Sequence, residues 1–137
     1  MEKLVWNDSL SVGVPEIDAQ HQQLVQLLNQ MIENEDAYVR SEIISDTLTR
    51  MTEYADYHFT TEEAYMQAYS FPDYEAHRIQ HVEFMRKTAQ LALAAMDYDK
   101  QVPQELLTYL KDWLIEHILQ SDMKYKPYFV GKPSPMG

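Results

Sequence analysis

Five histidines and two carboxylates are the residues whose types and spacing could do chemistry in this chain. Two pairs stand four residues apart, His58 with Glu62 and His77 with His81, and a Ser-Phe-Pro-Asp break at 70–73 separates them. Residues four apart lie on one face of an α-helix, so each pair directs two metal-binding side chains the same way. Because proline interrupts a helix interior but fits its first turn, the break predicts two helices with a short connection. Antiparallel neighbours of this kind can bring all four side chains to one metal site.

The other histidines, His21 and His117, extend this pattern to two further helices. A lone histidine on an apolar face is usually an ordinary core residue, but here all five histidines stand in the apolar seams of the expected helices. Burying five imidazoles without partners would cost about 1–3 kcal/mol each, a large share of the ~5–15 kcal/mol stability of a domain. One metal centre would satisfy them together. Glu62 has no Lys or Arg in the adjoining seam positions, so we expect its partner to be metal as well.

Spacing alone leaves two interpretations of Asp122 open. It stands five residues after His117, about 140° round an ideal helix. Asp122 therefore joins the metal site only if the helix ends or widens at that point. Otherwise it is a surface aspartate at the end of the last helix.

The available side chains limit which metals to consider. The chain has no cysteine, which excludes thiolate zinc sites and cysteine-ligated iron–sulfur clusters. Five imidazoles and two carboxylates exceed one tetrahedral or octahedral ion, so we expect two six-coordinate ions bridged by carboxylates. Nitrogen and oxygen ligands favour iron, with manganese or a zinc pair as alternatives. No Glu-x-x-His motif occurs, unlike in the common di-iron carboxylate bundles, and this indicates binding rather than oxidative catalysis.

Helices must position these residues. Apolar residues recur at alternating steps of three and four, the pattern of a bundle helix, and strand-like alternation nowhere exceeds it. The pattern predicts an all-α four-helix bundle with these helices: 18 to about 33–36, 40–68, 73–96, and 103 to about 121–122.

The two ends of the chain are expected to differ from the bundle. Residues 1–17 read as an irregular arm, pinned to the body by Trp6, Val12 and Ile17. After a polar turn at 97–101 and the last helix, the tail is amphipathic up to Phe129, which predicts a short helical tail. Residues 131–137 are rich in proline and glycine, so we expect them to be flexible.

Composition sets the outer limits. With 137 residues, 45% of them hydrophobic, and three glycines, we expect a single domain over 1–137. The net charge of −11 argues against nucleic acid and against an anionic membrane as a partner. No apolar run reaches the ~18–20 residues of a membrane span. The N-terminus lacks the apolar core of a secretory signal. We therefore expect a cytoplasmic monomer with no membrane insertion.

The ordered ligand residues resemble the hemerythrin family in its stand-alone bacterial form. The match covers about residues 4–130, includes the N-terminal residues Trp6, Ile17, Asp18 and Gln20, and is carried by the following segments: His21, His58-Phe-Thr-Thr-Glu62, His77-Arg-Ile-Gln-His81 and His117-Ile-Leu-Gln-Ser-Asp122. The resemblance implies an up-down-up-down bundle holding two iron ions with an oxo or hydroxo bridge. By that resemblance Asp122 is a ligand.

The resemblance also implies how the residues divide. One iron takes His77, His81 and His117; the other takes His21 and His58 and keeps a position open for dioxygen. Glu62 and Asp122 bridge the two ions. At the positions that line the oxygen pocket in the family, this chain has five apolar residues, for which ordinary core packing is the alternative: Leu24, Phe59, Trp113, Leu114 and Ile118.

The function implied by the resemblance is reversible dioxygen binding for storage or delivery, without enzymatic activity and with an unknown oxygen acceptor. One alternative is an oxygen or redox sensor, which normally needs a fused output domain for which 137 residues leave no room. Another is a di-metal oxidase or hydrolase, which should show an acid or base beyond the ligands. The sequence offers no clear candidate for that group.

Overall fold

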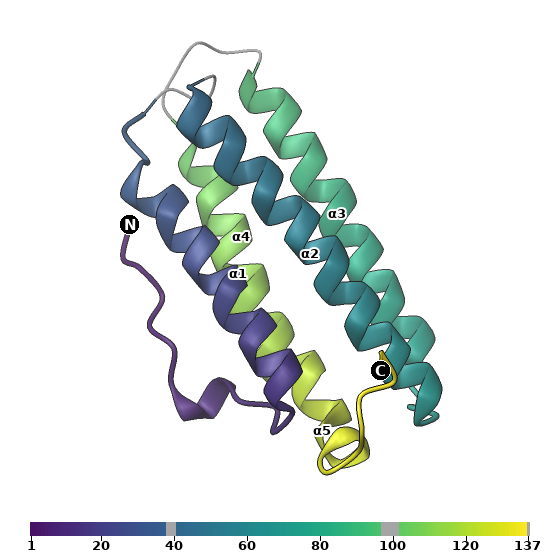
Figure 1. Ribbon diagram of the computed structural model, residues 1–137. Coiled ribbons are helices and arrows are strands. Elements are labelled where there is room, and N and C mark those ends of the chain that lie inside the picture. Colours follow the sequence, from purple (N-terminus) through teal and green to yellow (C-terminus); the bar gives the residue numbers. More distant parts are fainter. Residues whose placement is uncertain (38–40, 97–101, 137) are drawn as a thin grey trace.

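The computed structural model describes residues 1–37, 41–96 and 102–136, and within these ranges the secondary structure is entirely helical. Four long helices form the body (Figure 1): α1 (Pro15–Glu33), α2 (Glu42–Ala68), α3 (Tyr74–Met96) and α4 (Gln104–Glu116). Three short elements complete the fold: the 3-10 turn η1 (Asp8–Leu10), the π-helical turn η2 (His117–Asp122) and α5 (Met123–Phe129). The predicted all-α class is confirmed.

The four long helices alternate in direction, α1 and α3 one way and α2 and α4 the other (Figure 1). Each packs against two neighbours, because α1 contacts α2 and α4 while α3 also contacts α2 and α4. The result is the four-helix bundle with up-down-up-down topology that the sequence and the family resemblance predicted.

The first helix begins earlier than the apolar seam suggested. Pro15 is its first residue, so the irregular arm ends at Val14 rather than at residue 17. Proline at the first helical position has no N–H to leave unpaired, and its fixed φ suits the helix. The carboxylate of Asp18 then holds the arm in place, since it accepts the backbone N–H of Val12 at 2.8 Å and the Ser11 hydroxyl at 2.5 Å.

The arm is attached to the bundle as predicted. Val12 and Ile17 are fully buried, and Trp6 packs against the main apolar cluster. Asn29 of α1 adds a pair of hydrogen bonds to the backbone of Leu4, at 2.8 and 2.9 Å. No helix in the described ranges is long and apolar enough to cross a membrane.

The connection between α2 and α3 brings the two four-spaced pairs together. Ser70 follows the end of α2 with a positive φ of 54°, and the N–H of Phe71 bonds the carbonyl of Met66 at 2.9 Å. This reversal is a Schellman motif, which closes a helix and turns the chain back sharply. Phe71 and Met66 are buried in one cluster, so an apolar contact fixes the turn.

The last helix does not end near Asp122 as expected. It widens into η2 over residues 117–122 and continues as α5 to Phe129, so the predicted helical tail is an unbroken extension of α4. Beyond it, Gly131 has a positive φ of 77°, and the Tyr69 hydroxyl bonds the carbonyl of Pro133. That 131–137 are flexible, and that 1–137 form a single domain, stay predictions. The polar turn predicted at 97–101 lies outside the described residues.

Two apolar clusters fill the bundle, and the seven candidate ligands lie between them along the chain. The main cluster contains Leu24, and a second cluster, which includes Tyr125 and Phe129 of α5, contains Ile17. On α1, His21 lies between Ile17 and Leu24. Along α2, Ala55 belongs to the main cluster and Tyr65 to the other. The fold therefore places its polar layer inside an apolar environment.

Candidate metal centre

The structure brings all seven sequence-predicted ligands into one buried layer. Each is at most 5% exposed, and the set draws on α1, α2, α3 and the turn η2 that continues α4: His21, His58, Glu62, His77, His81, His117 and Asp122. Ionisable side chains are rarely buried this completely without partners or a metal. A metal-binding site would account for their burial at one place.

The seven side chains form two overlapping groups. In each group the ligand atoms lie within 4.8 Å of one another. The three-histidine group contains Glu62, His77, His81 and His117; the two-histidine group contains His21, His58, Glu62 and Asp122. Glu62 is shared, so its carboxylate lies between the two halves of the site.

The oxygens of Asp122 point into different halves. Oδ1 lies 2.9 Å from Nε2 of His77 and 3.0 Å from Nε2 of His117, while Oδ2 lies 3.0 Å from Nε2 of His21. Glu62 divides in a similar way, with Oε1 in contact with Nε2 of His58 and Oε2 3.6 Å from Nε2 of His77. Two carboxylates with this placement can each join two cations.

The π-helical turn explains how Asp122 reaches the site. In an α-helix, residues four apart stack, and Asp122 would face away from His117. In η2 the hydrogen bonds span five residues instead, so residues five apart stack one turn above another. The sequence left open whether the helix ends or widens here. It widens, and His117 and Asp122 share one face as a result.

Unpaired polar atoms indicate that these residues fit a cation. Within the described residues, nine buried side-chain nitrogen or oxygen atoms make no contact with the geometry of a hydrogen bond. Six of them face one another in this layer: both carboxylate oxygens of Glu62 and of Asp122, and the Nε2 atoms of His21 and His77. Leaving a buried polar atom unpaired costs about 1–3 kcal/mol. Metal ions between these atoms would satisfy them, and nitrogen and oxygen ligands suit iron.

The Nε2 atoms of His81 and His117 supply a second test of the fit. They face one another at 3.2 Å, while Nδ1 of His81 lies 3.0 Å from a carboxylate oxygen of Glu63. A carboxylate can only accept, so the proton of neutral His81 sits on Nδ1 and its Nε2 presents a lone pair. That lone pair can accept the Nε2–H of His117; when both Nε2 atoms are unprotonated, the two lone pairs face one another and can bind one cation.

Without metal, protons compensate the buried carboxylates. Burial lowers the pKa of His21 and of His77, but the nearby Asp122 and Glu62 outweigh it and raise each pKa to about 9. For His58 and His81 burial prevails, and their pKa values are lowered. The pKa of Glu62 and that of Asp122 both lie below their ordinary values, since the histidines outweigh the burial that raises them.

Two supporting residues received no role from the sequence. Nδ1 of His58 lies 2.7 Å from the amide oxygen of Gln20, and Glu63 holds His81 as described. Outer partners of this kind fix the tautomer and orientation of metal-binding imidazoles. Gln20 is a buried polar residue on an otherwise apolar helix face, a signal that sequence could have offered. Glu63 carried none, because exposed glutamates are common on helices.

Tyr125 is a third residue that sequence reasoning missed. It is fully buried in α5, its ring centroid lies 5.7 Å from that of His77, and its hydroxyl makes no hydrogen bond to any described residue. Burial and the negative charges of Asp122 and Glu62 raise its pKa well above 10. The phenol is therefore neutral and lies close to the carboxylates.

The five predicted pocket residues lie in one apolar cluster around the ligands. Four are buried there and Trp113 packs against them half-buried: Leu24, Phe59, Trp113, Leu114 and Ile118. Two of them have a defined relation to ligands. Phe59 stacks on His81, with ring centroids 3.9 Å apart, and Trp113 stacks on His117 at 4.3 Å.

Known proteins share this sequence pattern and fold. A family model described as the hemerythrin HHE cation binding domain matches residues 12–129. A bacteriohemerythrin of Clostridium acetobutylicum is 30% identical over 125 residues, which span 88% of this chain and 97% of that protein. A hemerythrin-like protein of Naegleria gruberi is 29% identical over 121 residues, covering 88% of this chain and 89% of the relative.

Solved hemerythrin structures have the same fold as this chain. Wild-type hemerythrin superposes with a TM-score of 0.84 at 26% identity, over 93% of this chain and 98% of that chain. A leucine-to-alanine mutant of hemerythrin gives 0.85 at 26% identity, over 96% and 100%. The family match spans most of the bundle and includes all seven candidate ligands, from His21 to Asp122. The chain belongs to the hemerythrin family.

Proposed function

We propose that this chain binds dioxygen reversibly at a non-haem di-iron centre and serves in oxygen storage or delivery. The observation that carries the proposal is the pair of overlapping ligand groups around Glu62, buried in an apolar cluster. The bacterial relative that is 30% identical is named a bacteriohemerythrin.

The proposed ligand assignment follows the two groups. His77, His81 and His117 would hold one iron and His21 and His58 the other, with the carboxylates of Glu62 and Asp122 within reach of both halves. When bound, the two iron ions supply the electrons that dioxygen accepts and returns. The protein would contribute neutral imidazoles, two carboxylates shared between the halves, and apolar side chains that keep water away from the site.

Apolar side chains supply the shielding. Leu24, Leu114 and Ile118 are at most 5% exposed and lie in the same cluster as Phe59. Such a wall admits a small uncharged molecule but disfavours water and ions, because transferring charge into an apolar environment is costly. By keeping water and ions out, these side chains would disfavour the release of a charged product, as a reversible carrier requires. On this proposal the chain is not an enzyme.

Sensing is a second candidate, favoured by one contact between the chain ends. The ligands His117 and Asp122 continue directly into α5, where Lys126 donates to the backbone carbonyl of Ser11 at 3.4 Å. A shift of the ligand helix would therefore reach the N-terminal arm. Hydrogen exchange tests this alternative: a sensor should change exchange over 8–14 and 123–130 between oxygen-bound and oxygen-free protein, whereas a carrier should not.

The test of reversible binding is the visible spectrum of the reduced, iron-loaded protein before and after exposure to oxygen, and again after argon. We expect an absorption band to appear with oxygen and to disappear under argon over repeated cycles, with two irons per chain by elemental analysis. Irreversible conversion to the ferric form in the first cycle would contradict the carrier function. One iron per chain would contradict the paired centre.

A further inference from the structure

The two halves of the metal centre hold their imidazoles with different partners. His58, in the two-histidine group, has its Nδ1 2.7 Å from the neutral amide oxygen of Gln20. His81, in the three-histidine group, has its Nδ1 3.0 Å from a carboxylate oxygen of Glu63. Each arrangement leaves Nε2 facing the site, so the difference lies in the charge of the partner.

A chain of hydrogen bonds determines the orientation of Gln20. The Thr61 hydroxyl donates to the backbone carbonyl of Tyr57 at 3.2 Å and accepts from Nε2 of Gln20 at 3.2 Å. The amide nitrogen is thereby committed to Thr61, and the amide oxygen is left to face His58. Since that oxygen can only accept, Nδ1 of His58 is the protonated nitrogen and Nε2 carries the lone pair.

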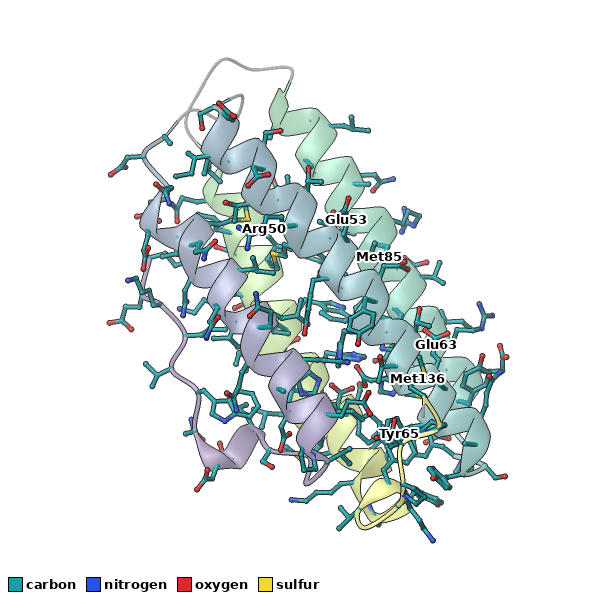
Figure 2. The ribbon with its side chains drawn as sticks, viewed as in Figure 1. Arg50, Glu53, Glu63, Tyr65, Met85 and Met136 are labelled. Carbon is teal, nitrogen blue, oxygen red and sulfur yellow. The ribbon has the colours of Figure 1, made fainter. Side chains whose placement is uncertain are left out.

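Glu63 differs from Gln20 in both charge and location. It follows the shared ligand Glu62 on α2, its side chain is 25% exposed, and it points toward α3, from which His81 comes (Figure 2). Hydrogen bonds from imidazole to a carboxylate are roughly twice as strong as those to a neutral acceptor. An anionic partner also raises the basicity of the coordinating nitrogen, and so strengthens its bond to a metal.

Packing holds the same half rigid. Phe59 lies flat on His81, with ring planes 7° apart, and Trp113 lies flat on His117 at 11°. In the other half, the ring of His58 is tilted by 49° to that of Phe59, with centroids 5.8 Å apart. Ligands that are already oriented lose less freedom when a cation binds.

We infer that Glu63 is a positioning residue that makes the three-histidine half the stronger cation site, so that it fills first, while Gln20 holds His58 in the weaker half. The inference rests on the proposed metal centre but not on dioxygen binding. It concerns how the chain assembles its two ions and why the two positions are unequal.

Zinc is a suitable probe, because Zn²⁺ is not oxidised or reduced and accepts four nitrogen and oxygen ligands, the number in each group. Metal-free full-length chain labelled with ¹⁵N-histidine is titrated with Zn²⁺ at fixed pH, while chelator competition gives the affinity of each step. We expect the imidazole signals of His77, His81 and His117 to shift in the first step, and those of His21 and His58 in the second.

Glu63→Gln should weaken the first step about ten- to hundred-fold, the usual effect of losing an outer partner, and leave the second step unchanged. The matched control is Glu53→Gln, which removes the same charge from an exposed position nearer the start of α2 (Figure 2). Gln20→Met, similar in volume, should weaken only the second step. In the metal-free protein, the ¹⁵N shifts should place the proton of His81 on Nδ1 in wild type, and Glu63→Gln should weaken that preference.

The outcomes separate the two proposals. If wild type binds no zinc at the seven side chains, the metal centre fails and the inference fails with it. If two ions bind but Glu63→Gln behaves like Glu53→Gln, or the two-histidine half fills first, the centre stands and the inference alone is wrong. Circular dichroism of the metal-free variants checks that the fold is intact.

Discussion

The two halves of the metal centre meet the protein surface differently. His21 and His58 are each 1% exposed, whereas ligands of the three-histidine half border two surface hollows. One hollow of about 240 Å³ is lined in part by His117 and Trp113. The other, of about 310 Å³, is lined in part by His81, Phe59 and Glu63. One half is therefore enclosed, and the other lies just beneath the surface.

This difference indicates how one bundle can both admit a small uncharged molecule and hold a cation firmly. An enclosed position favours a small uncharged guest and excludes water. A position with an anionic outer partner and stacked aromatic rings favours a firmly held cation. Because Glu62 belongs to both groups, the two requirements are met side by side within one bundle. The predictions that follow test this division.

The largest effect is expected from removing what the two halves share. Glu62→Gln keeps the volume of the side chain but loses the charge and one acceptor oxygen in both groups. We expect iron content to fall from two per chain to below one, and the visible spectrum to disappear. Elemental analysis after reconstitution measures this, with Glu63→Gln as the control that still loads two irons at saturating metal. Retention of two irons by Glu62→Gln would show that Glu62 is not a shared ligand.

Removing one half at a time should cost about half the metal. His21→Leu deletes a ligand of the two-histidine group only, and His81→Leu deletes one of the three-histidine group only. Each variant should hold one ion, and the ion should remain in the half that was not altered. Zinc titration with ¹⁵N-histidine signals locates it. A variant that loses both ions would mean that neither half forms without the other.

Much of this site was predictable because its signals are local. Spacings of four in His58–Glu62 and His77–His81 follow directly from helix geometry, as does the bundle seam. Asp122 could not be placed by the same argument, since η2 departs from the α-helical period that the argument assumes. The family resemblance supplied what spacing lacked.

The helix ends and outer partners were harder to predict. Pro15 begins α1 although the apolar seam starts later, so the arm was assigned three residues too many. Phe129, not Asp122, ends the last helix, because buried contacts of α5 with Tyr65 and Phe71 extend it. Gln20 and Glu63 act through pairings between residues 18 to 38 positions apart, and no local pattern encodes these.

An intermediate effect is expected from pH on the metal-free protein. His21 and His77, with pKa values raised from 6.5 to about 9, contribute stability that is fully present below pH 6.5 and is lost as pH rises through 9. The lowered pKa values of His58 and His81 act oppositely, so stability also falls below pH 6.5. The metal-free protein should therefore be most stable near pH 6.5.

Urea unfolding with a chelator present, at pH values from 5 to 9, measures this dependence. We expect the free energy of unfolding to fall by on the order of a few kcal/mol between pH 6.5 and 9. The iron-loaded protein should not show this alkaline loss, because cations replace the protons between the carboxylates. Equal stability of the metal-free protein at pH 6.5 and 9 would mean that His21 and His77 do not compensate Asp122 and Glu62.

The smallest effect is expected from opening the apolar wall while keeping every ligand. Leu114→Ala removes a buried side chain, 5% exposed, one turn before Ile118 and next to the stacked Trp113. The change should cost about 2–5 kcal/mol of stability, so iron content and helicity are checked first.

If Leu114 helps to keep water from the enclosed half, the oxygenated form should decay to the ferric form several-fold faster, with little change in the ferric spectrum. Timing that decay by absorbance measures the effect. Leu107→Ala is the matched control, because Leu107 is also buried in α4 and lies two turns farther from His117. Equal decay in both variants would mean that general loosening of the core, and not a local wall, sets the rate. Faster decay in Leu114→Ala alone would place the wall where the enclosed half requires it.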